Sequence, residues 1–176
     1  MNKILFFGYG ANRSKSKINQ IIGGEPGSGM GAIIEGYRLA YQSLDQIPEP
    51  AKTNLQKTWG NDFKAYTLKE GEGVVGGVLW EISEEDFQKI KEWEYIGVWR
   101  ELIEVDIKTS DGKRIHVLTE KAPGIHPISG YTDGLLYSEY EFLDLKQKEK
   151  VQISKYYNDR QIQEIRENLA AIQKGK

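Results

Sequence analysis

The sequence contains no cysteine and only two histidines, His116 and His126, in 176 residues. Without cysteine the chain has no disulfide framework, no thiolate nucleophile and no cysteine-based metal site. The two histidines are ten residues apart and lack the HExxH spacing of a helical zinc site. We therefore do not expect metal chemistry.

Basic residues are not in excess either. The 24 Lys and Arg residues are scattered among 26 Asp and Glu residues, and the formal net charge is -2. Such a chain lacks the basic patch of a nucleic-acid-binding protein. We expect a small-molecule or protein partner and no nucleic acid.

Long apolar runs are also missing. No segment approaches the roughly 20 residues of a membrane span, and the first apolar run, residues 4–7, is too short for the core of a signal peptide. We expect a cytoplasmic protein with no membrane partner. The length fits a single domain over residues 1–176, with residues 150–176 as a C-terminal helical extension.

The most informative stretch lies near the start of the chain. Residues 3–7 have the composition of a strand, Gly8-Tyr9-Gly10 follows, and a helix is expected over about 13–22. A glycine turn between strand and helix presents backbone N–H groups to a carboxylate or phosphate, and glycine permits positive φ and the close approach of a ligand. The alternative is an ordinary strand-to-helix turn, and the spacing leaves both open.

Two familiar phosphate-binding loops do not fit this chain. The dinucleotide fingerprint requires a third glycine where this sequence has Arg13. In the second glycine-rich run, residues 23–31, Met30 occupies the position of the lysine of a Walker loop. We interpret residues 23–31 as a flexible loop.

The rest of the chain alternates strands, loops and helices. Gly36 predicts a bulge in its strand, and Gly71 and Gly73 predict a turn between two strands, the second of which is apolar on both faces like a central strand. His116 is on the polar face of its strand and is expected at the surface. Strands are expected over residues 32–41, 63–68, 74–82, 103–107 and 115–118, helices over 83–94, 137–149 and from about 158, and loops over 42–60 and 121–136.

A carboxylate stands at a core position of the helix that follows the predicted central strand. Glu94 lies seven residues after Phe87, within roughly 20° of its direction on an ideal helix, so it is predicted to point inward among Trp93, Tyr95 and Trp99. Burial raises the pKa of a carboxyl group and suits it to acid or base chemistry near neutral pH. The alternative is that the helix ends at Trp93 and Glu94 faces water, and the pattern leaves both open.

Taken in order, these segments resemble the γ-glutamylcyclotransferase family and its AIG2-like relatives. Tyr9-Gly10-Ala11-Asn12 is similar to the family's Tyr-Gly-Ser-Asn-Leu loop. The resemblance covers roughly residues 3–145 and rests on an ordered set of blocks rather than on one motif. The further blocks are Gly36-Tyr37-Arg38-Leu39, Trp59-Gly60, Val74 to Trp80, the helix leading to Glu94, and Leu136 to Tyr140.

The resemblance implies an α+β fold with a small mixed, largely antiparallel β-barrel-like sheet flanked by helices. It implies that Glu94 is the catalytic acid/base residue and that Trp99 and Tyr140 line the substrate pocket. The α-carboxylate of a γ-glutamyl group would bind to backbone N–H groups of a loop. The residues of that loop are Tyr9, Gly10, Ala11, Asn12 and Arg13.

In that family's chemistry the substrate's own α-amino group attacks its γ-carbonyl, closes 5-oxoproline and expels an amine or amino acid, as in glutathione metabolism. Because the reaction is intramolecular, the protein chiefly holds the substrate curled, and one glutamate with a raised pKa can move the proton. No cofactor is implied. The expected partner is a small γ-glutamyl substrate, and the expected state is a monomer or homodimer.

The sequence departs from the family pattern at several positions. Ala11 replaces the loop serine, Arg13 an aliphatic residue, Lys91 an aspartate and Tyr95 a glycine, and Trp99 stands near a usual tyrosine. One alternative is a non-catalytic small-carboxylate-binding or protein-interaction module on the same fold. Another is a different acyl-group chemistry that uses the same glutamate.

Overall fold

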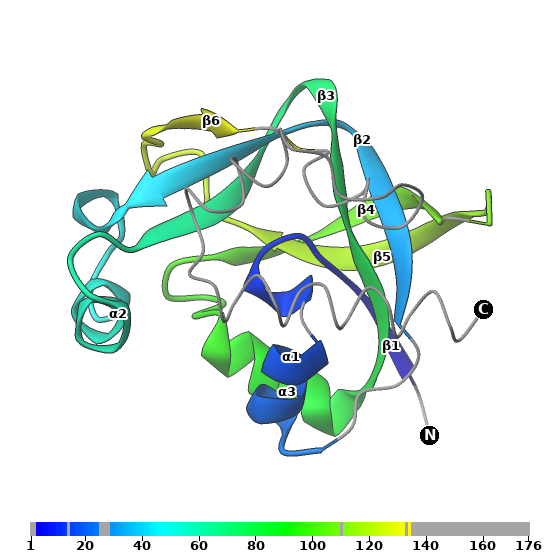
Figure 1. The fold of residues 1–176 in the computed structure, drawn as a ribbon, viewed down its shortest axis with the longest axis horizontal. Helices are drawn as coiled ribbons and strands as arrows, with labels where there is room; N and C mark the ends of the chain where they lie inside the picture. Colours follow the sequence, from blue (N-terminus) through cyan, green and yellow to red (C-terminus); the bar gives the residue numbers. More distant parts are fainter. Residues whose placement is uncertain (1–2, 14, 25–28, 110, 133, 135–176) are drawn as a thin grey trace, which may run out of the picture.

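The computed structural model describes residues 3–13, 15–24, 29–109, 111–132 and 134, and six strands within them form one sheet (Figure 1). They are β1 Lys3–Gly8, β2 Gly29–Ser43, β3 Lys64–Ser83, β4 Glu101–Thr109, β5 Arg114–Lys121 and β6 Gly130–Thr132. Their order is β3-β1-β5-β4-β2-β6, and β3 also pairs with β2, so β1 to β5 close into a barrel. In this described part β1 and β5 run parallel, whereas the other pairs are antiparallel. The predicted α+β, barrel-like fold is confirmed.

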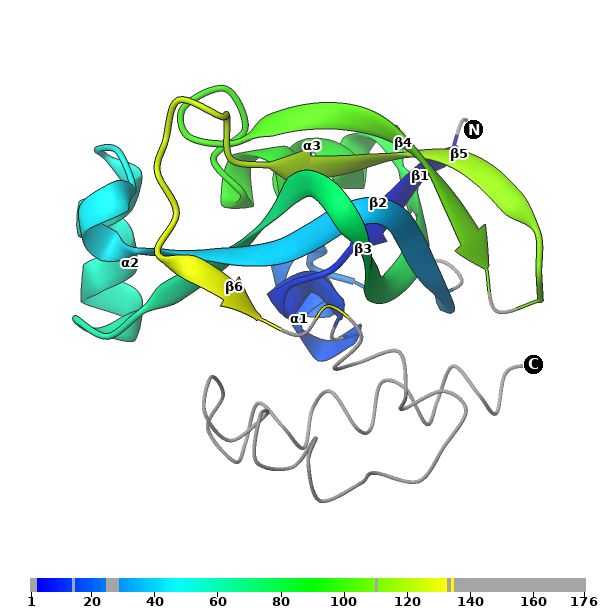
Figure 2. The ribbon, with the colours of Figure 1, turned by 90° about the horizontal axis from the view of Figure 1, so that it is seen from above.

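Helices cover one side and one end of the barrel. The helical elements are η1 Ala11–Arg13, α1 Lys15–Ile22, η2 Leu44–Gln46, α2 Ala51–Trp59 and α3 Glu84–Trp93, of which η1 and η2 are 3-10 turns. α1 and α3 lie side by side against the outer face of the barrel, and α2 lies at the far end of β2 and β3 (Figures 1 and 2). The first predicted helix is confirmed, although η1 occupies its expected start.

β1 contributes to two hydrophobic cores. Phe7, and Tyr9 directly after the strand, belong to the cluster inside the barrel, while Phe6 belongs to the cluster between the barrel and the helices α1 and α3. This alternation is the period of two expected of a strand. The Phe6 ring lies 5.6 Å from that of Phe87 on α3, and burying such a side chain contributes roughly 1.5–3 kcal/mol. The strand before the glycine loop is therefore held firmly on both faces.

α3 begins where the sequence predicts. The Ser83 hydroxyl accepts the backbone N–H of Asp86 at 3.2 Å, which satisfies one of the free donors of the first helical turn. The buried residues Phe87 and Ile90 pack toward α1 and the barrel. This packing fixes the direction in which α3 approaches the barrel edge.

β2 and β3 form a long, bent ribbon. The predicted bulge at Gly36 is confirmed, because this residue has a φ of 84° and the register shifts there. The predicted turn at Gly71 and Gly73 is wrong, because β3 runs through both glycines without reversing. A Cβ at Gly73 would lie 2.6 Å from the carbonyl oxygen of Tyr37, so this glycine permits close approach of the two strands. The predicted central strand is confirmed, since β3 pairs with β1 and with β2.

The prediction of a loop over residues 42–60 is wrong, because η2 and α2 occupy much of it. Pro48 and Pro50 precede α2 rather than interrupt it. A helix tolerates proline at its start, where the missing N–H is not needed. Ala51 in the first turn of α2 is fully buried in a cluster with Trp99. This contact ties α2 to the segment that leads into β4.

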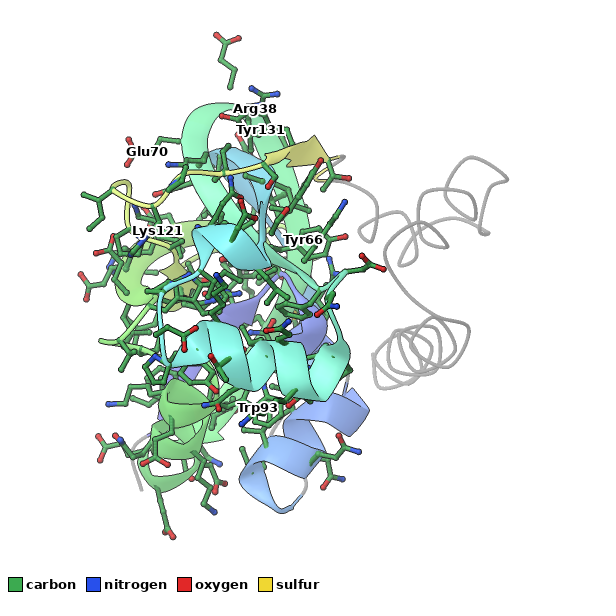
Figure 3. The ribbon with its side chains drawn as sticks, turned by 90° about the vertical axis from the view of Figure 1, so that its left-hand side faces the viewer. Arg38, Tyr66, Glu70, Trp93, Lys121 and Tyr131 are labelled. Atoms are coloured by element: carbon green, nitrogen blue, oxygen red, sulfur yellow. The ribbon has the colours of Figure 1, made fainter. Side chains whose placement is uncertain are left out.

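β4 and β5 form the predicted hairpin, with Gly112 at a φ of 87° in its turn. His116 is exposed on the outer face, as predicted. The predicted loop over residues 121–136 is wrong in part, because it contains the short strand β6, which pairs with β2. Figure 3 shows Arg38 of β2 beside Tyr131 of β6, and the guanidinium carbon lies 3.5 Å from the ring centroid. This contact joins β6 to the outer side of the ribbon.

Several expectations fall outside the residues that the structure describes. They are the helices over 137–149 and from about 158, the C-terminal extension 150–176, and Tyr140. Among the described helices, none is both long enough and apolar enough to cross a membrane.

Candidate functional site

The strand order brings three chain segments to one edge of the barrel. β1 and β5 run parallel, with Phe6 opposite Leu118, so their carboxyl ends meet at the same edge. β4 is antiparallel to β5, and its first residue, Glu101, pairs with Lys121 at the end of β5. The glycine loop after β1, the start of β4 and the end of β5 are therefore neighbours.

α3 ends at this edge in a Schellman motif. The N–H of Ile96 donates to the carbonyl of Lys91 at 3.0 Å, and the N–H of Tyr95 donates to that of Glu92 at 3.2 Å. The residue after the helix cap takes the left-handed conformation that favours glycine, and here it is Tyr95, with a φ of 56°. This is the position at which the resembled family commonly has glycine.

Glu94 is the cap residue of α3, and its carboxylate points into the protein. Its side chain is only 14% exposed, so the inward direction is confirmed even though the helix ends at Trp93. The predicted place of Trp93 beside the carboxylate is wrong, because Trp93 is 46% exposed, and the carboxylate contacts Asn12 and Arg100. The left-handed residue that follows Glu94 turns the chain, so an ideal helix does not describe this environment.

Asn12 links the glycine loop to Glu94. Its Oδ1 accepts the N–H of Gly10 at 3.2 Å, which orients the amide so that Nδ2 donates to Glu94 Oε1 at 3.3 Å. Its backbone carbonyl accepts the indole N–H of Trp80 at 2.8 Å. A Cβ on Gly8 would lie 2.6 Å from Asn12 Oδ1, so the glycine leaves room for this amide. The loop is thus built around the side chain that contacts Glu94.

Arg100 and Glu120 form a buried ion pair next to Glu94. Nη1 of Arg100 donates to Oε2 of Glu120 and lies 3.8 Å from Oε2 of Glu94. The side chains of Arg100 and Glu120 are 8% and 2% exposed. The guanidinium carbon also lies 4.3 Å from the ring centroid of Trp99. One guanidinium therefore faces two carboxylates.

These surroundings shift the pKa of Glu94. Burial, followed by the charge of Glu120, raises the pKa of Glu94 from 4.5 to about 7, while Arg100 and the amide of Asn12 act in the opposite direction. The cap position adds to the upward shift, because helix carbonyls at the C-terminus disfavour a negative charge. A carboxyl group with a pKa near 7 both accepts and returns a proton at neutral pH.

Tyr9 ties the end of β1 to the end of β5. It is fully buried, and its hydroxyl donates to the backbone carbonyl of Glu120 at 2.5 Å. Burial, and then the charge of Glu120, raises the pKa of Tyr9, so the phenol keeps its proton and remains a donor. A direct role of Tyr9 in substrate binding stays a prediction.

The loop from Gly10 to Arg13 forms a 3-10 turn. The N–H of Gly10 donates to Asn12, and the N–H of Arg13 donates to the Gly10 carbonyl at 3.1 Å. The N–H group of Asn12 has no acceptor within the described residues, so it and the neighbouring N–H of Ala11 are the loop's candidates for binding an anion. Neither Gly8 nor Gly10 has a positive φ. Gly8 makes room for the side chain of Asn12, and Gly10 has open space beside it.

The other predicted site residues have different surroundings. Arg13 is buried, with its guanidinium carbon 5.9 Å from the ring centroid of Tyr66. Trp99 is buried in the cluster beside α2, and its Nε1 donates to Oε1 of Gln42 at 3.1 Å. Tyr140 lies outside the described residues, so its place in a shared pocket stays a prediction.

Sequence reasoning missed Arg100 and Glu120. Neither belongs to a motif, and Glu120 lies on the same face of β5 as the exposed His116. The one available signal is Leu118, an apolar residue between them on that face, which packs against the helix-side core.

The part of the chain that the structure describes contains no group of three or more His, Cys, Asp or Glu residues arranged to hold a metal ion. At the barrel edge, the carboxylates of Glu94 and Glu120 lie beside the guanidinium of Arg100. The arrangement is suited to holding and moving a proton.

No protein-family model and no curated protein matches this chain. Solved structures share its fold. A human protein described as uncharacterized matches with a TM-score of 0.58 and 18% identity, over 98% of this chain and 89% of its own. A gamma-glutamyl cyclotransferase matches with a TM-score of 0.58 and 17% identity, over 97% and 88%. A yeast gamma-glutamyl cyclotransferase specific to glutathione matches with a TM-score of 0.50 and 12% identity, over 100% and 99%. The suspected resemblance is thus confirmed at the level of the fold.

Proposed function

We propose that this protein is a γ-glutamylcyclotransferase-like enzyme that converts a γ-glutamyl amine or peptide to 5-oxoproline and releases the amine or amino acid. The observation that carries the proposal is the buried carboxyl of Glu94, with a pKa of about 7, joined through Asn12 to the loop after β1. The fold shared with structures named gamma-glutamyl cyclotransferase supports the same activity.

The loop supplies the substrate anchor in this proposal. The N–H groups of Ala11 and Asn12 bind the α-carboxylate of the γ-glutamyl group. The α-carbon carries both the carboxylate and the ammonium group, so a carboxylate held beside Asn12 brings the ammonium group toward Glu94. The hydrogen bond from Asn12 to Glu94 supports this placement.

Glu94 then moves the proton. It removes one proton from the α-ammonium group, and the freed amine attacks the γ-carbonyl carbon to form the lactam C–N bond. As the tetrahedral intermediate collapses, the bond to the leaving nitrogen breaks and Glu94 returns a proton to that nitrogen. The attacking nitrogen loses two protons in all and the amine leaves as ammonium, so the reaction consumes no proton. Holding the chain curled supplies much of the acceleration.

The test is an assay of 5-oxoproline release from a panel of γ-glutamyl dipeptides, γ-glutamyl amines and glutathione. We expect turnover of at least one substrate by the wild-type protein and loss of turnover in Glu94→Gln. Glu92→Gln is the matched control, because Glu92 lies two residues before Glu94 and is exposed. Absence of 5-oxoproline from every γ-glutamyl compound would overturn the proposal.

The second candidate is a non-catalytic module that binds a small carboxylate with the same loop. The departures Ala11 and Tyr95 favour it, because both alter positions beside the proposed reacting groups. Calorimetry with 5-oxoproline and with γ-glutamyl compounds separates the two, since the module binds the intact compound and leaves it unchanged.

A further inference from the structure

The guanidinium of Arg100 lies between two carboxylates, and it contacts them unequally. Its Nη1 donates directly to Glu120, whereas the distance from Nη1 to Glu94 Oε2 is 3.8 Å, beyond hydrogen-bond length. Both Glu120 and Glu94 approach the same nitrogen atom. The guanidinium is therefore engaged by Glu120 and is only a neighbour of Glu94.

This inequality matters for the chemistry of Glu94. A carboxylate that accepts a direct hydrogen bond from Arg is held in its ionised form, with a pKa about 1–3 units below its ordinary value. Such a carboxylate is a weak base and returns no proton near neutral pH. Glu94 avoids this state because Arg100 is turned to Glu120.

We propose that Glu120 is a positioning residue that holds the Arg100 guanidinium away from Glu94, so that the Glu94 carboxylate stays available for proton transfer. The inference rests on the proposed function for what the proton transfer achieves. The arrangement itself is testable without any substrate.

Glu120 is well placed to hold Arg100. Its side chain is the most buried of the three charged groups, and its own carbonyl receives the Tyr9 hydroxyl at 2.5 Å. The face of the Trp99 ring supports the guanidinium from another side. The Nε of Arg100 is buried without a hydrogen-bond partner among the described residues, so the guanidinium has unused donor capacity. Without Glu120, a hydrogen bond to the Glu94 carboxylate would satisfy these buried donors.

Within the part of the chain that the structure describes, four groups face Glu94 from the elements packed around it. They are Tyr9 at the end of β1, Asn12 on η1, Arg100 before β4 and Glu120 on β5. Tyr9 stays protonated and Asn12 is neutral. Removing the charge of Glu120 therefore lowers the pKa of Glu94, because it removes the repulsion between the two carboxylates and frees the guanidinium of Arg100.

The experiment measures the titration midpoint of Glu94 by carbon NMR of the carboxyl group in the full-length protein, with the signal assigned by its loss in Glu94→Gln. We expect Glu120→Gln to lower the midpoint by about 1–3 pH units. Glu120→Asp, which keeps the charge, is expected to stay within about half a unit of wild type. The control Glu101→Gln removes the same charge from an exposed pair with Lys121 and is expected to leave the midpoint unchanged.

An unchanged or higher midpoint in Glu120→Gln overturns the inference. If Glu120→Gln does not fold, Glu120→Ala takes its place as the test, and an unchanged or higher midpoint in that variant overturns the inference. The assay of 5-oxoproline is read separately. If Glu120→Gln lowers the midpoint but the wild-type protein releases no 5-oxoproline from any substrate, the positioning role is supported and the proposed function is rejected. Turnover by the wild-type protein with an unchanged midpoint in Glu120→Gln does the reverse.

Discussion

The replacement Glu94→Gln gives the sharpest test of the site, because it changes stability and activity in opposite directions. The pKa of Glu94 is about 7 in the folded protein, against 4.5 for an ordinary glutamate. Between these values the folded protein holds a proton that the unfolded chain has released. The free energy of unfolding of the wild type therefore falls as pH rises from about 4.5 to about 7.

The size of this effect follows from the pKa shift. A shift of this size corresponds to about 3 kcal/mol, at roughly 1.4 kcal/mol per pH unit. Glutamine does not titrate, so in Glu94→Gln this group no longer lowers the free energy of unfolding as pH rises. Relative to wild type, the variant should gain about 3 kcal/mol of stability on going from pH 4 to pH 8. Activity should fall by about 10²–10⁴-fold in kcat, with little change in the binding of 5-oxoproline.

Urea unfolding at a series of pH values checks the first part, and steady-state kinetics check the second. Glu92→Gln is the control, because that side chain is exposed and neighbours the site in sequence. Its unfolding curves and its kcat should match those of wild type. Parallel stability profiles for Glu94→Gln and wild type would refute the buried, protonated state of Glu94, and full turnover in Glu94→Gln would refute its role.

Three further predictions concern the segments that place Glu94. Because Tyr95 has a φ of 56°, Tyr95→Gly should be more stable than Tyr95→Ala by about 1 kcal/mol in urea unfolding, and equal values would contradict the left-handed turn. A Cβ at Gly77 would lie 2.3 Å from the Gly8 carbonyl oxygen, so Gly77→Ala should lower the free energy of unfolding by about 1–3 kcal/mol. A Cβ at Gly10 has nothing within 4 Å, so Gly10→Ala should lower it by about 0.5 kcal/mol or less. Thermal unfolding of the two variants gives the order, and the reverse order would reject this packing. Asn12→Ala removes a donor from the Glu94 carboxylate, so the acid limb of the pH–rate profile should move to higher pH, and a move to lower pH would contradict the contact.

Local patterns predict the parts of this fold that local physics determines. The strand before the glycine loop, the bulge at Gly36, the cap at Ser83 and the hairpin at Gly112 each depend on a few adjacent residues, and all four are present. The failures are places where a local signal has two meanings. Proline before residue 51 starts a helix as readily as it interrupts one, and the glycines of β3 permit close approach instead of reversal.

The inward direction of Glu94 is a correct prediction with an incomplete reason. The helical phase from Phe87 indicates the right side of α3, because the helix persists almost to that point. The surroundings of the Glu94 side chain depend on the turn after α3, where Tyr95 adopts a left-handed conformation that residues other than glycine rarely adopt. A pattern that averages over residue types predicts another course for the chain at this position, so it predicts aromatic neighbours instead of Asn12 and Arg100.

The buried ion pair of Arg100 and Glu120 is the part of the site that was not predicted from the sequence, and the reason lies in how β5 is covered. His116, Leu118 and Glu120 share one face of the strand, and along it burial rises from exposed, through half-buried, to fully buried. The first two residues follow the rule that polar groups face water and apolar groups face the core, while Glu120 breaks it. Glu120 can be buried because Arg100, the residue just before the antiparallel neighbour β4, lies at the same end of the hairpin and carries the opposite charge. The two side chains are 20 residues apart in the sequence, and they meet only when β4 and β5 pair, so no local pattern around either residue shows the ion pair.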